Sequence, residues 1–561
     1  MPQHIAIGTS DFKDIRERGS YFVDKSLFIK EIEECGSATL LTRPRRFGKT
    51  LALSMLRYFY ELGEDNSHLF EGLAIENEEK VMLHQGKHPV IYLTLKEIKE
   101  KNWADAYLSI KVMLKDMLEP FHYLLKDSQC SLIFKDSYLA ITKNKGTLND
   151  FKFILLRLSA ELYRFHKAKV VILIDEYDTP IQQAYLSGYY NESISFFKTF
   201  LGSGLKDNVA LERAVLTGIS RVSREGLFSD LNNFSSYSIL NAERFTTSFG
   251  FTEGEVKQML KDYGMNGVEF GEIKKWYDGY LFGGTTIYNP WSILCFVSNP
   301  KDGCKPYWVN TSDNALLRRF FFKGQTNIEG DIEKLIRGQA FRVEIEEYLS
   351  FPQLEISENA IWNLLLFTGY LRVSGLAKNS DTILEGNIRV PNLEVRHVYR
   401  TQIRNWIAED MHYLDYTKMI NALTRGELAP FELFFADFLL KTVSFHDTSK
   451  NVIENFYHAL LLGMLAMLGS KYIIKSNCES GYGRYDICMI PKDKTQKGIV
   501  IEIKAPDKQR KTLRGALMEA RNQMKKCKYD TELAAHGISD ILRLCIAIQG
   551  KDFMLREVVM A

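Results

Sequence analysis

The segment RPRRFGKT (residues 43–50), which follows the apolar run ATLL (residues 38–41) after one threonine, constrains this chain more than any other feature. A buried strand that passes through a short loop into a helix brings backbone N–H groups and a helix N-terminus to one point, where an anion binds. We expect Lys49 to neutralise the β and γ oxygens of a nucleotide and the Thr50 hydroxyl to reach Mg²⁺. In the general phosphate-binding loop motif a glycine stands where this chain has Arg43. A Gly-Lys-Thr triplet by itself also occurs by chance.

A second element, VVILIDEYD (residues 170–178), has the composition of a central parallel strand buried on both faces. Such a strand ends at the carboxyl edge of its sheet, where α/β proteins form their ligand crevice. There we expect Asp175 to hold the Mg²⁺ shell and Glu176 to polarise the attacking water. The alternative is an apolar strand that meets a solvated acidic turn. Together, the loop and the acidic strand favour a nucleoside triphosphate site.

The sequence around the loop resembles a family. The opening from IGTSDFKDIRERGSYFVDKS to RPRRFGKTLALSML is similar to the bacterial AAA-ATPase-like family, in which an arginine at the first motif position is usual. The match continues through LTGISRVSREGLFSDLNN (residues 216–233) and WYDGYLFGGTTIYNPWSIL (residues 276–294). The resemblance implies an α/β fold with a P-loop NTPase core and a parallel sheet. It also implies that ATP contacts the loop residues Arg45, Arg46, Phe47, Gly48, Lys49 and Thr50.

Further elements of this core can be placed. We expect a strand at residues 89–95, helices at 103–117 and 148–165, and another buried strand at AVLTGI (residues 214–219). Such ATPases often place a residue that senses the γ-phosphate at the position of Thr217. Arg221 and Arg224 follow, and an arginine there stabilises charge that develops in phosphoryl transfer. The alternative is that both arginines are charges on a helix surface.

The chain of 561 residues, 45% of them hydrophobic, is long enough for about three domains. We expect an ATPase-like domain at 1–294, a mostly helical linking domain at 295–445 and a nuclease-like domain at 446–561. The family resemblance implies that the aromatic and glycine-rich segment at 276–291 closes the ATPase module, over the nucleotide base, and the alternative is a tightly packed corner. Residues 361–373 read as a helix, a turn at Gly369 and a strand, which is consistent with a winged-helix-like arrangement. DNA binding and internal packing both remain open for it.

The C-terminal part carries a second set of charged residues. RYDICMI (residues 484–490) and IVIEIK (residues 499–504) read as two strands around a polar turn. In a hairpin centred near Lys494, Asp486 falls opposite Glu502, and alternation puts Glu502 and Lys504 on one strand face. This predicts a Mg²⁺ site that cleaves phosphodiesters, with Asp486 and Glu502 as ligands and Lys504 orienting or deprotonating water. The alternative is a solvated amphipathic hairpin.

This segment is similar to the PD-(D/E)XK nuclease superfamily, which implies an α/β restriction-endonuclease-like fold. Glu454 matches the acid on the superfamily's N-terminal helix, and Gln523 with Tyr529 matches a helix motif in which Gln523 supports Lys504 or a phosphate. Tyr485 replaces the proline that precedes the metal-binding aspartate, which bears on activity and not on fold. His458 is expected to be a packed, hydrogen-bonded histidine.

Charge and composition limit the partners. The net charge of +2 gives no global signature for nucleic acid, but residues 491–530 hold 12 Lys or Arg against 5 Asp or Glu. The eight cysteines form no CxxC pair, no signal segment opens the chain, and the longest apolar run is too short for a bilayer. These features predict a cytoplasmic protein without a membrane partner.

The sequence therefore predicts an ATP- and Mg²⁺-dependent enzyme with a nuclease-like module that acts on nucleic acid, with nucleotide state controlling access. The alternative is a nucleotide-dependent switch or scaffold that binds nucleic acid without cutting it. DNA versus RNA and the oligomeric state remain open.

Overall fold

The computed structural model groups the chain into two compact units. Unit 1 contains Met1–Ser312 and Ala340–Val395, and unit 2 contains Asp313–Gln339 and Arg396–Ala561. The structure describes residues 3–559 apart from 222–233, 266–269, 309–330, 332–333, 336–337, 349–350, 356, 381–382, 400–412, 443–456, 459–460, 462–463, 466–467, 469–470, 477–478, 481–482, 507–511 and 528–530. The three-part division expected from the sequence stays a prediction, because one compact unit can hold more than one domain.

Unit 1 is built on a five-stranded sheet with the order β2-β3-β4-β1-β5, and every neighbouring pair is parallel. The parallel sheet predicted from the apolar runs is confirmed. The strands β1 and β3 are buried along their whole length, as expected for central strands covered on both faces. The bounds are β1 Ala38–Thr42, β2 Val90–Thr94, β3 Val170–Asp175, β4 Leu211–Gly218 and β5 Phe234–Tyr237.

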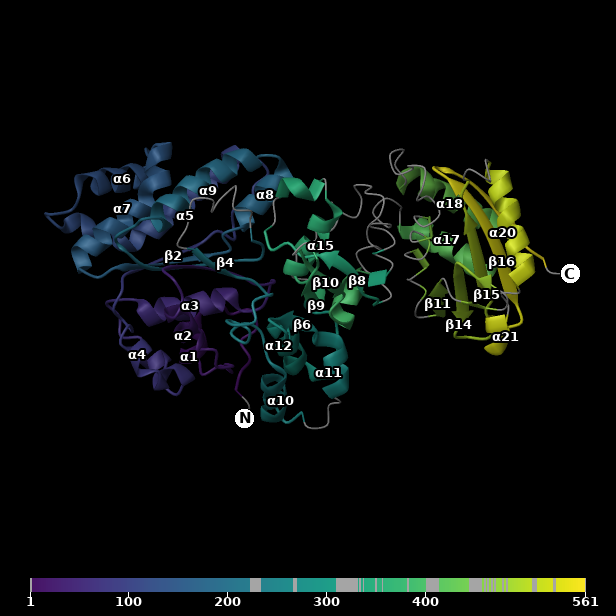
Figure 1. Ribbon diagram of the computed structural model, residues 1–561, viewed down its shortest axis with the longest axis horizontal. Helices are drawn as coiled ribbons and strands as arrows, with labels where there is room; N and C mark the ends of the chain where they lie inside the picture. Colours follow the sequence, from purple (N-terminus) through teal and green to yellow (C-terminus); the bar gives the residue numbers. More distant parts are fainter. Residues whose placement is uncertain are drawn as a thin grey trace. The chain divides into compact units, whose positions relative to one another are not determined.

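Helices cover both faces of this sheet (Figure 1). One face carries α1 Phe12–Glu17, α2 Phe28–Glu33, α3 Lys49–Tyr60 and α4 Glu79–Met82. The other carries α5 Trp103–Leu118, α6 Leu132–Thr142, α7 Leu148–His166, α8 Thr179–Ser187 and α9 Tyr190–Leu205. The strand predicted at 89–95 and the helices predicted at 103–117 and 148–165 are confirmed. The last of these begins with a capping box between Thr147 and Asp150, which fixes its start.

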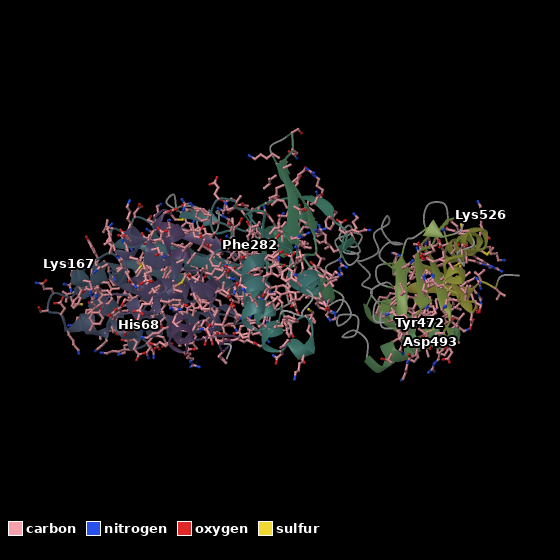
Figure 2. All side chains as sticks on the ribbon, turned by 90° about the horizontal axis from the view of Figure 1, so that it is seen from below. His68, Lys167, Phe282, Tyr472, Asp493 and Lys526 are labelled. Carbon is pink, nitrogen blue, oxygen red and sulfur yellow. The ribbon has the colours of Figure 1, made fainter. Side chains whose placement is uncertain are left out.

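The remainder of unit 1 contains small elements between residues 234 and 395. These are α10 Glu253–Asp262, α11 Phe270–Tyr277, β6 Tyr280–Phe282, β7 Thr285–Ile287, α12 Pro290–Ser298, β8 Phe341–Glu344, α15 Glu358–Phe367, β9 Arg372–Lys378 and β10 Leu384–Arg389. The helix, glycine turn and strand predicted at 361–373 are confirmed as α15, Gly369 and β9, and β9 joins the antiparallel sheet β8-β10-β9. Figure 2 shows Phe282 inside unit 1 and Lys167 at its surface.

Unit 2 is a mixed five-stranded sheet with the order β11-β14-β15-β16-β17, in which only β15 and β16 are parallel neighbours among the described strands. Its elements are α17 Tyr413–Arg425, α18 Leu428–Thr442, β11 Tyr472–Ser476, β12 Glu479–Ser480, β13 Gly483–Arg484, β14 Ile487–Pro491, β15 Gly498–Lys504, α20 Leu513–Cys527, α21 Thr531–Ala535, β16 Ile541–Gln549 and β17 Asp552–Glu557.

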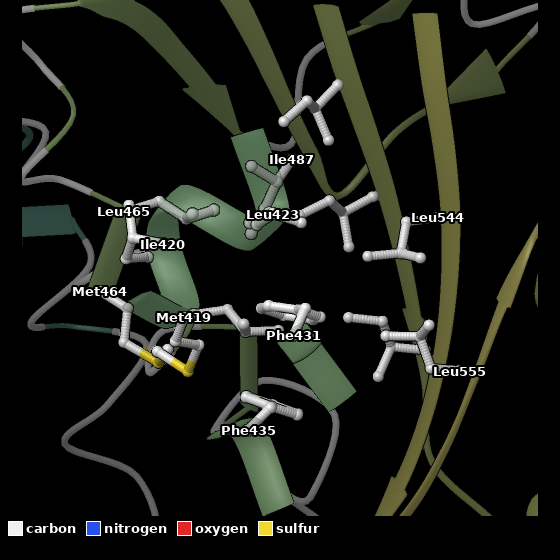
Figure 3. Close-up of a cluster of buried hydrophobic side chains, with 14 of the residues drawn as sticks. Met419, Ile420, Leu423, Phe431, Phe435, Met464, Leu465, Ile487, Leu544 and Leu555 are labelled. Atoms are coloured by element: carbon white, nitrogen blue, oxygen red, sulfur yellow. The ribbon is translucent and has the colours of Figure 1, made fainter. Parts of the chain in front are cut away.

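The sheet of unit 2 has two apolar faces. Figure 3 shows one, where Phe431 and Phe435 of α18 belong to one buried cluster with Leu544 and Leu555 of the sheet. On the other face Val500 of β15 packs in a cluster with residues of α20. Side chains alternate along a strand, so Glu502 and Lys504 share the face of Val500 that α20 covers. None of the helices described in either unit is long and apolar enough to cross a membrane.

Candidate functional site

The loop at residues 43–48, called the phosphate loop below, connects the buried strand β1 to the helix α3. Gly48 caps the helix with φ of 90°, a conformation that glycine adopts without strain. The Lys49 ammonium donates to the carbonyl oxygens of Arg43 and Pro44, both at 3.0 Å. The lysine therefore lies inside the loop, at the helix N-terminus, where backbone N–H groups attract an anion.

Arg43 points away from this anion site. It is fully buried and donates to the carbonyl oxygens of Thr42 at 2.8 Å, Tyr237 at 3.1 Å and Phe245 at 2.9 Å. Its guanidinium also lies 5.2 Å from the centre of the Phe282 ring. Burial lowers the pKa of Arg43 to about 9, so the group keeps its charge at neutral pH. The residue that replaces the motif's glycine is therefore an anchor that ties the loop to β5 and to the segment after it.

Two further loop residues are held by aromatic rings. Arg46 lies 4.3 Å over the ring of Trp291 in α12. The Phe47 side chain is buried against Tyr280 and Phe282, with ring centres 4.9 and 5.2 Å apart. Phe47 can therefore contact a nucleotide only through its backbone.

The carboxylate of Asp175 joins three of the predicted residues. Asp175 is the last residue of β3 and is fully buried. Its Oδ2 accepts from the Thr50 hydroxyl at 2.7 Å, and its Oδ1 accepts from the Thr217 hydroxyl at 2.6 Å. Burial raises the pKa of Asp175, and the two hydroxyl hydrogen bonds oppose this rise. The structure thus brings together Thr50, Asp175 and Thr217, which lie far apart in the sequence.

Glu176 follows in a left-handed backbone conformation, with φ of 51°. Such a conformation costs about 1 kcal/mol or more for a non-glycine residue and occurs often at functional sites. Its carboxylate accepts from the Thr179 hydroxyl at 3.0 Å. Burial alone would raise the pKa of Glu176, but attraction to Lys49, the Thr179 hydrogen bond and attraction to Arg45 together lower it. Glu176 is therefore ionised at neutral pH and electrostatically linked to the loop lysine.

The sequence analysis missed Asp178. Its Oδ2 accepts from the backbone N–H groups of Ile219 at 3.0 Å and Ser220 at 2.8 Å, and from the Ser220 hydroxyl at 2.8 Å. This buried carboxylate fixes the segment after β4 against the segment after β3. The only signal in the sequence was a second aspartate three positions after Asp175.

Arg221 comes directly after this anchored segment. Its guanidinium pairs with the carboxylate of Glu347 and lies 4.2 Å over the Tyr348 ring. The predicted contact of Arg221 with a γ-phosphate stays a prediction. Arg224 lies outside the described residues.

A pocket of about 120 Å³ lies beside the phosphate loop. The phosphate loop contributes Gly48, the helix α3 contributes Leu51, and α12 contributes Pro290 and Leu294. Phe22, from the segment before α2, also lines it. Of the segment 276–291, which was expected to close the module over the base, Pro290 lines this pocket, and the closure over a base stays a prediction.

In unit 2 the hairpin pairs with Ile487 opposite Ile501 and Met489 opposite Ile499, which is the register expected for a turn centred near Lys494. Asp486, directly before β14, accepts from the Ile503 backbone N–H at 2.7 Å. The Lys504 ammonium lies 3.0 Å from Glu502 and 3.9 Å from Asp486. The structure therefore brings the two carboxylates and the lysine together.

Two of the residues around this cluster are buried and hydrogen-bonded. His458 is buried, and its Nε2 lies 3.0 Å from the carbonyl oxygen of Asp486, so the ring is packed and hydrogen-bonded as expected. Tyr485, which replaces the superfamily's proline, is fully buried and donates its hydroxyl to Glu532. Gln523 lies on α20, over the face that carries Glu502, and its contact with Lys504 stays a prediction. Glu454 and Tyr529 lie outside the described residues.

Both clusters have the donor chemistry that Mg²⁺ requires. Mg²⁺ is bound by hard oxygen ligands, usually one or two carboxylates together with substrate phosphates and water. Unit 1 offers the Thr50 hydroxyl and the Asp175 carboxylate in contact with each other, and unit 2 offers Asp486 and Glu502. The residues present therefore fit the ion at both places.

Comparisons with known proteins give one family match in each of the two units. Residues 6–228 match the family described as predicted AAA-ATPase, and residues 452–558 match the PD-(D/E)XK nuclease superfamily. The chain is also similar to an uncharacterized protein in the vnfD 5' region of Azotobacter chroococcum mcd 1, with 25% identity over 501 residues, which are 87% of either chain. The chain thus joins an N-terminal domain of the predicted AAA-ATPase family to a C-terminal domain of the PD-(D/E)XK nuclease superfamily.

Proposed function

We propose that unit 1 binds and hydrolyses ATP. The observation that carries this proposal is the contact of the Asp175 carboxylate with the Thr50 hydroxyl at 2.7 Å, at the N-terminus of α3. Thr50 and Asp175 would hold a Mg²⁺ ion, which would supply charge neutralisation at the phosphates. Thr217 fixes the second oxygen of Asp175.

The remaining residues have separate roles in this proposal. The Lys49 ammonium would exchange its two loop carbonyl partners for the β and γ oxygens of ATP. Glu176, ionised at neutral pH, would orient the attacking water and accept its proton. The pocket between Leu51 of α3 and Leu294 of α12 has apolar walls beside the loop, which suits an aromatic base.

We propose that unit 2 cleaves phosphodiesters of a nucleic acid. The convergence of Asp486, Glu502 and Lys504 supports this role, since two carboxylates and a lysine can hold a metal ion and activate water. Lys504 is only 7% exposed and is held by Glu502, so its ammonium has a fixed position. Nucleotide state in unit 1 would control access to this cluster.

Two matched pairs of variants test the proposal. Lys49→Ala should weaken binding of a fluorescent ATP analogue, whereas Lys257→Ala, which changes a lysine 56% exposed on α10, should not. Lys504→Ala should abolish Mg²⁺-dependent cleavage of plasmid, linear and single-stranded substrates. Lys497 lies in the same hairpin, where its ammonium pairs with Asp540 at 2.7 Å. The Lys497→Ala protein should cleave normally.

The outcomes separate the alternatives. Equal ATP affinity in wild type and Lys49→Ala would refute the nucleotide site. If wild type cuts no nucleic acid with any combination of Mg²⁺ and ATP but binds it, the protein is a switch or scaffold.

A further inference from the structure

A groove of about 880 Å³ runs along the edge of the unit 1 sheet, outside the phosphate loop. The strand β2 forms one wall with Val90, Tyr92 and Thr94, and the helix α5 forms the opposite wall. Since β2 is the outermost strand of the described sheet on this side, its second edge has no strand neighbour there. A groove between a sheet edge and a helix has the form of a site that binds a peptide strand.

The backbone groups that face this groove can be assigned from the sheet pairing. The Val171 N–H donates to the Pro89 carbonyl, and the Leu95 N–H donates to the Asp175 carbonyl. In a parallel ladder the N–H and C=O groups of every second residue face the same neighbouring strand, so those of residues 89, 91, 93 and 95 face β3. The N–H and C=O groups of Val90, Tyr92 and Thr94 therefore point to the groove.

Residues 60–62 of the chain itself pair with the residue before β2, and this pairing then ends. The His88 N–H donates to the Tyr60 carbonyl and the Leu62 N–H donates to the His88 carbonyl, both at 3.0 Å. Gly63, with φ of 105°, then turns the chain away. An added peptide would continue the line that residues 60–62 start, over the remaining length of β2. At about 3.3 Å per residue, the five residues of β2 match a peptide of about five residues.

The helix wall presents apolar side chains to this space. Leu108, Val112 and Asp116 follow one another at intervals of four, as do Ser109, Met113 and Met117, and so they share one face of α5. Leu108 is 60% exposed and Val112 is 53% exposed. Large apolar side chains that line a groove and stay this exposed mark an interaction site more often than scattered ones do.

The charged side chains that line the groove indicate which charge a bound segment should carry. Four carboxylates line it, from Glu61, Glu97, Glu100 and Asp116, against one arginine, Arg57. Arg57 already pairs with Glu61 at 3.4 Å. An occupant with lysine or arginine side chains is therefore complementary.

We propose that an extended segment of a partner protein, with apolar residues alternating with lysine or arginine, adds as a strand to β2 in this groove. Its backbone would pair with Val90, Tyr92 and Thr94. Its apolar side chains would pack on Leu108 and Val112. No residue of the phosphate loop and none of the carboxylates assigned to a metal ion lines this groove, and it would be occupied whether or not either candidate site is catalytic.

The test begins with a phage-displayed random dodecapeptide library panned on the full chain. Enrichment of sequences that alternate apolar and basic residues is expected. The synthetic form of the most enriched peptide is then measured by fluorescence anisotropy. Val112→Arg should weaken its binding about tenfold or more, because a charge replaces an apolar contact. Val209→Arg makes the same change at a residue 81% exposed outside the groove and should leave the affinity unchanged.

N-methylation of the peptide separates strand addition from simple apolar docking and does not depend on the folding of any variant. Methylation of alternate amides should abolish binding in one register and leave it nearly intact in the other, since only every second N–H of an added strand faces β2. Equal effects of both registers, or no enriched peptide at all, would overturn the proposal. Self-association of the chain that Val112→Arg abolishes would also overturn it, with a second copy as the occupant.

Discussion

Replacing Arg43 with glycine would give the phosphate loop the residue that the general motif has at this position. We nevertheless expect Arg43→Gly to destabilise unit 1 and to weaken ATP binding. The arginine donates three hydrogen bonds to buried carbonyl oxygens, those of Thr42, Tyr237 and Phe245, and it lies against the Phe249 and Phe282 rings. Glycine removes all five contacts and leaves a cavity.

The magnitude follows from three terms. Three carbonyl groups left without their donor cost about 1–3 kcal/mol each, and the cavity costs about 2–5 kcal/mol. The relief of one buried charge returns several kcal/mol, since burying an ion is itself costly. The net loss in the free energy of unfolding should be about 3–5 kcal/mol. The Arg43→Met side chain fills most of the arginine's volume but has no hydrogen-bond donor. It should therefore restore only the part of the stability that glycine loses through the cavity.

Urea unfolding followed by tryptophan fluorescence measures this loss, because five of the six tryptophans belong to unit 1. Equilibrium ATP binding is measured on the same variants at a urea concentration of zero. An Arg43→Gly protein within about 1 kcal/mol of wild type, with equal or tighter ATP binding, would show that the arginine is not an anchor.

Four other outcomes are expected. Glu176→Gln should keep ATP binding and slow hydrolysis by about 10²-fold or more in a phosphate-release assay. Glu502→Ala and Lys504→Ala should each abolish cleavage, and the double variant should lose no more than either, because the residues act as a unit. Burial raises the pKa of Glu394 to about 7, so the folded state binds its proton more tightly than the unfolded state does. Stability should therefore fall by up to about 3 kcal/mol as the pH rises from about 4.5 to 7, and Glu394→Gln should flatten this fall in urea titrations at each pH. If nucleotide state controls the nuclease, ATP and nucleic acid must change each other's affinity by the same factor, and identical ATP dissociation constants with and without DNA bound to Asp486→Ala would leave two independent units.

Local pattern was sufficient for most of the fold. The run VVILI in β3 is too uniformly apolar for a surface strand, and the structure buries all of it. The hairpin of β14 and β15 has a register that follows from its turn, so the meeting of Asp486 with Glu502 could be predicted from counting alone. The helices α5 and α7 were found from their periodicity to within one or two residues.

Residues whose roles depend on distant partners could not be predicted in this way. Nothing near Arg43 in the sequence names Tyr237 or Phe245, which are about 200 positions away. Asp178 gave the sequence analysis no signal beyond its charge, because its partner Ser220 lies 42 positions further along. In each case the side chain satisfies backbone groups that only the folded chain brings into reach.

The two candidate sites differ in how far apart in the sequence their residues lie. This separation decides which parts of the fold set the geometry of each site. Asp486 and Glu502 are 16 positions apart and are brought together by one hairpin, so the register of that hairpin sets their geometry. Thr50 and Asp175 are 125 positions apart, and Thr217 is 42 positions beyond Asp175, so their meeting requires the order of β1, β3 and β4 in the sheet. The Asp175 carboxylate loses a hydroxyl partner if either α3 or β4 shifts. The proposed nucleotide site should therefore respond to any movement of β4 or α3, which is the property that a nucleotide-dependent switch needs.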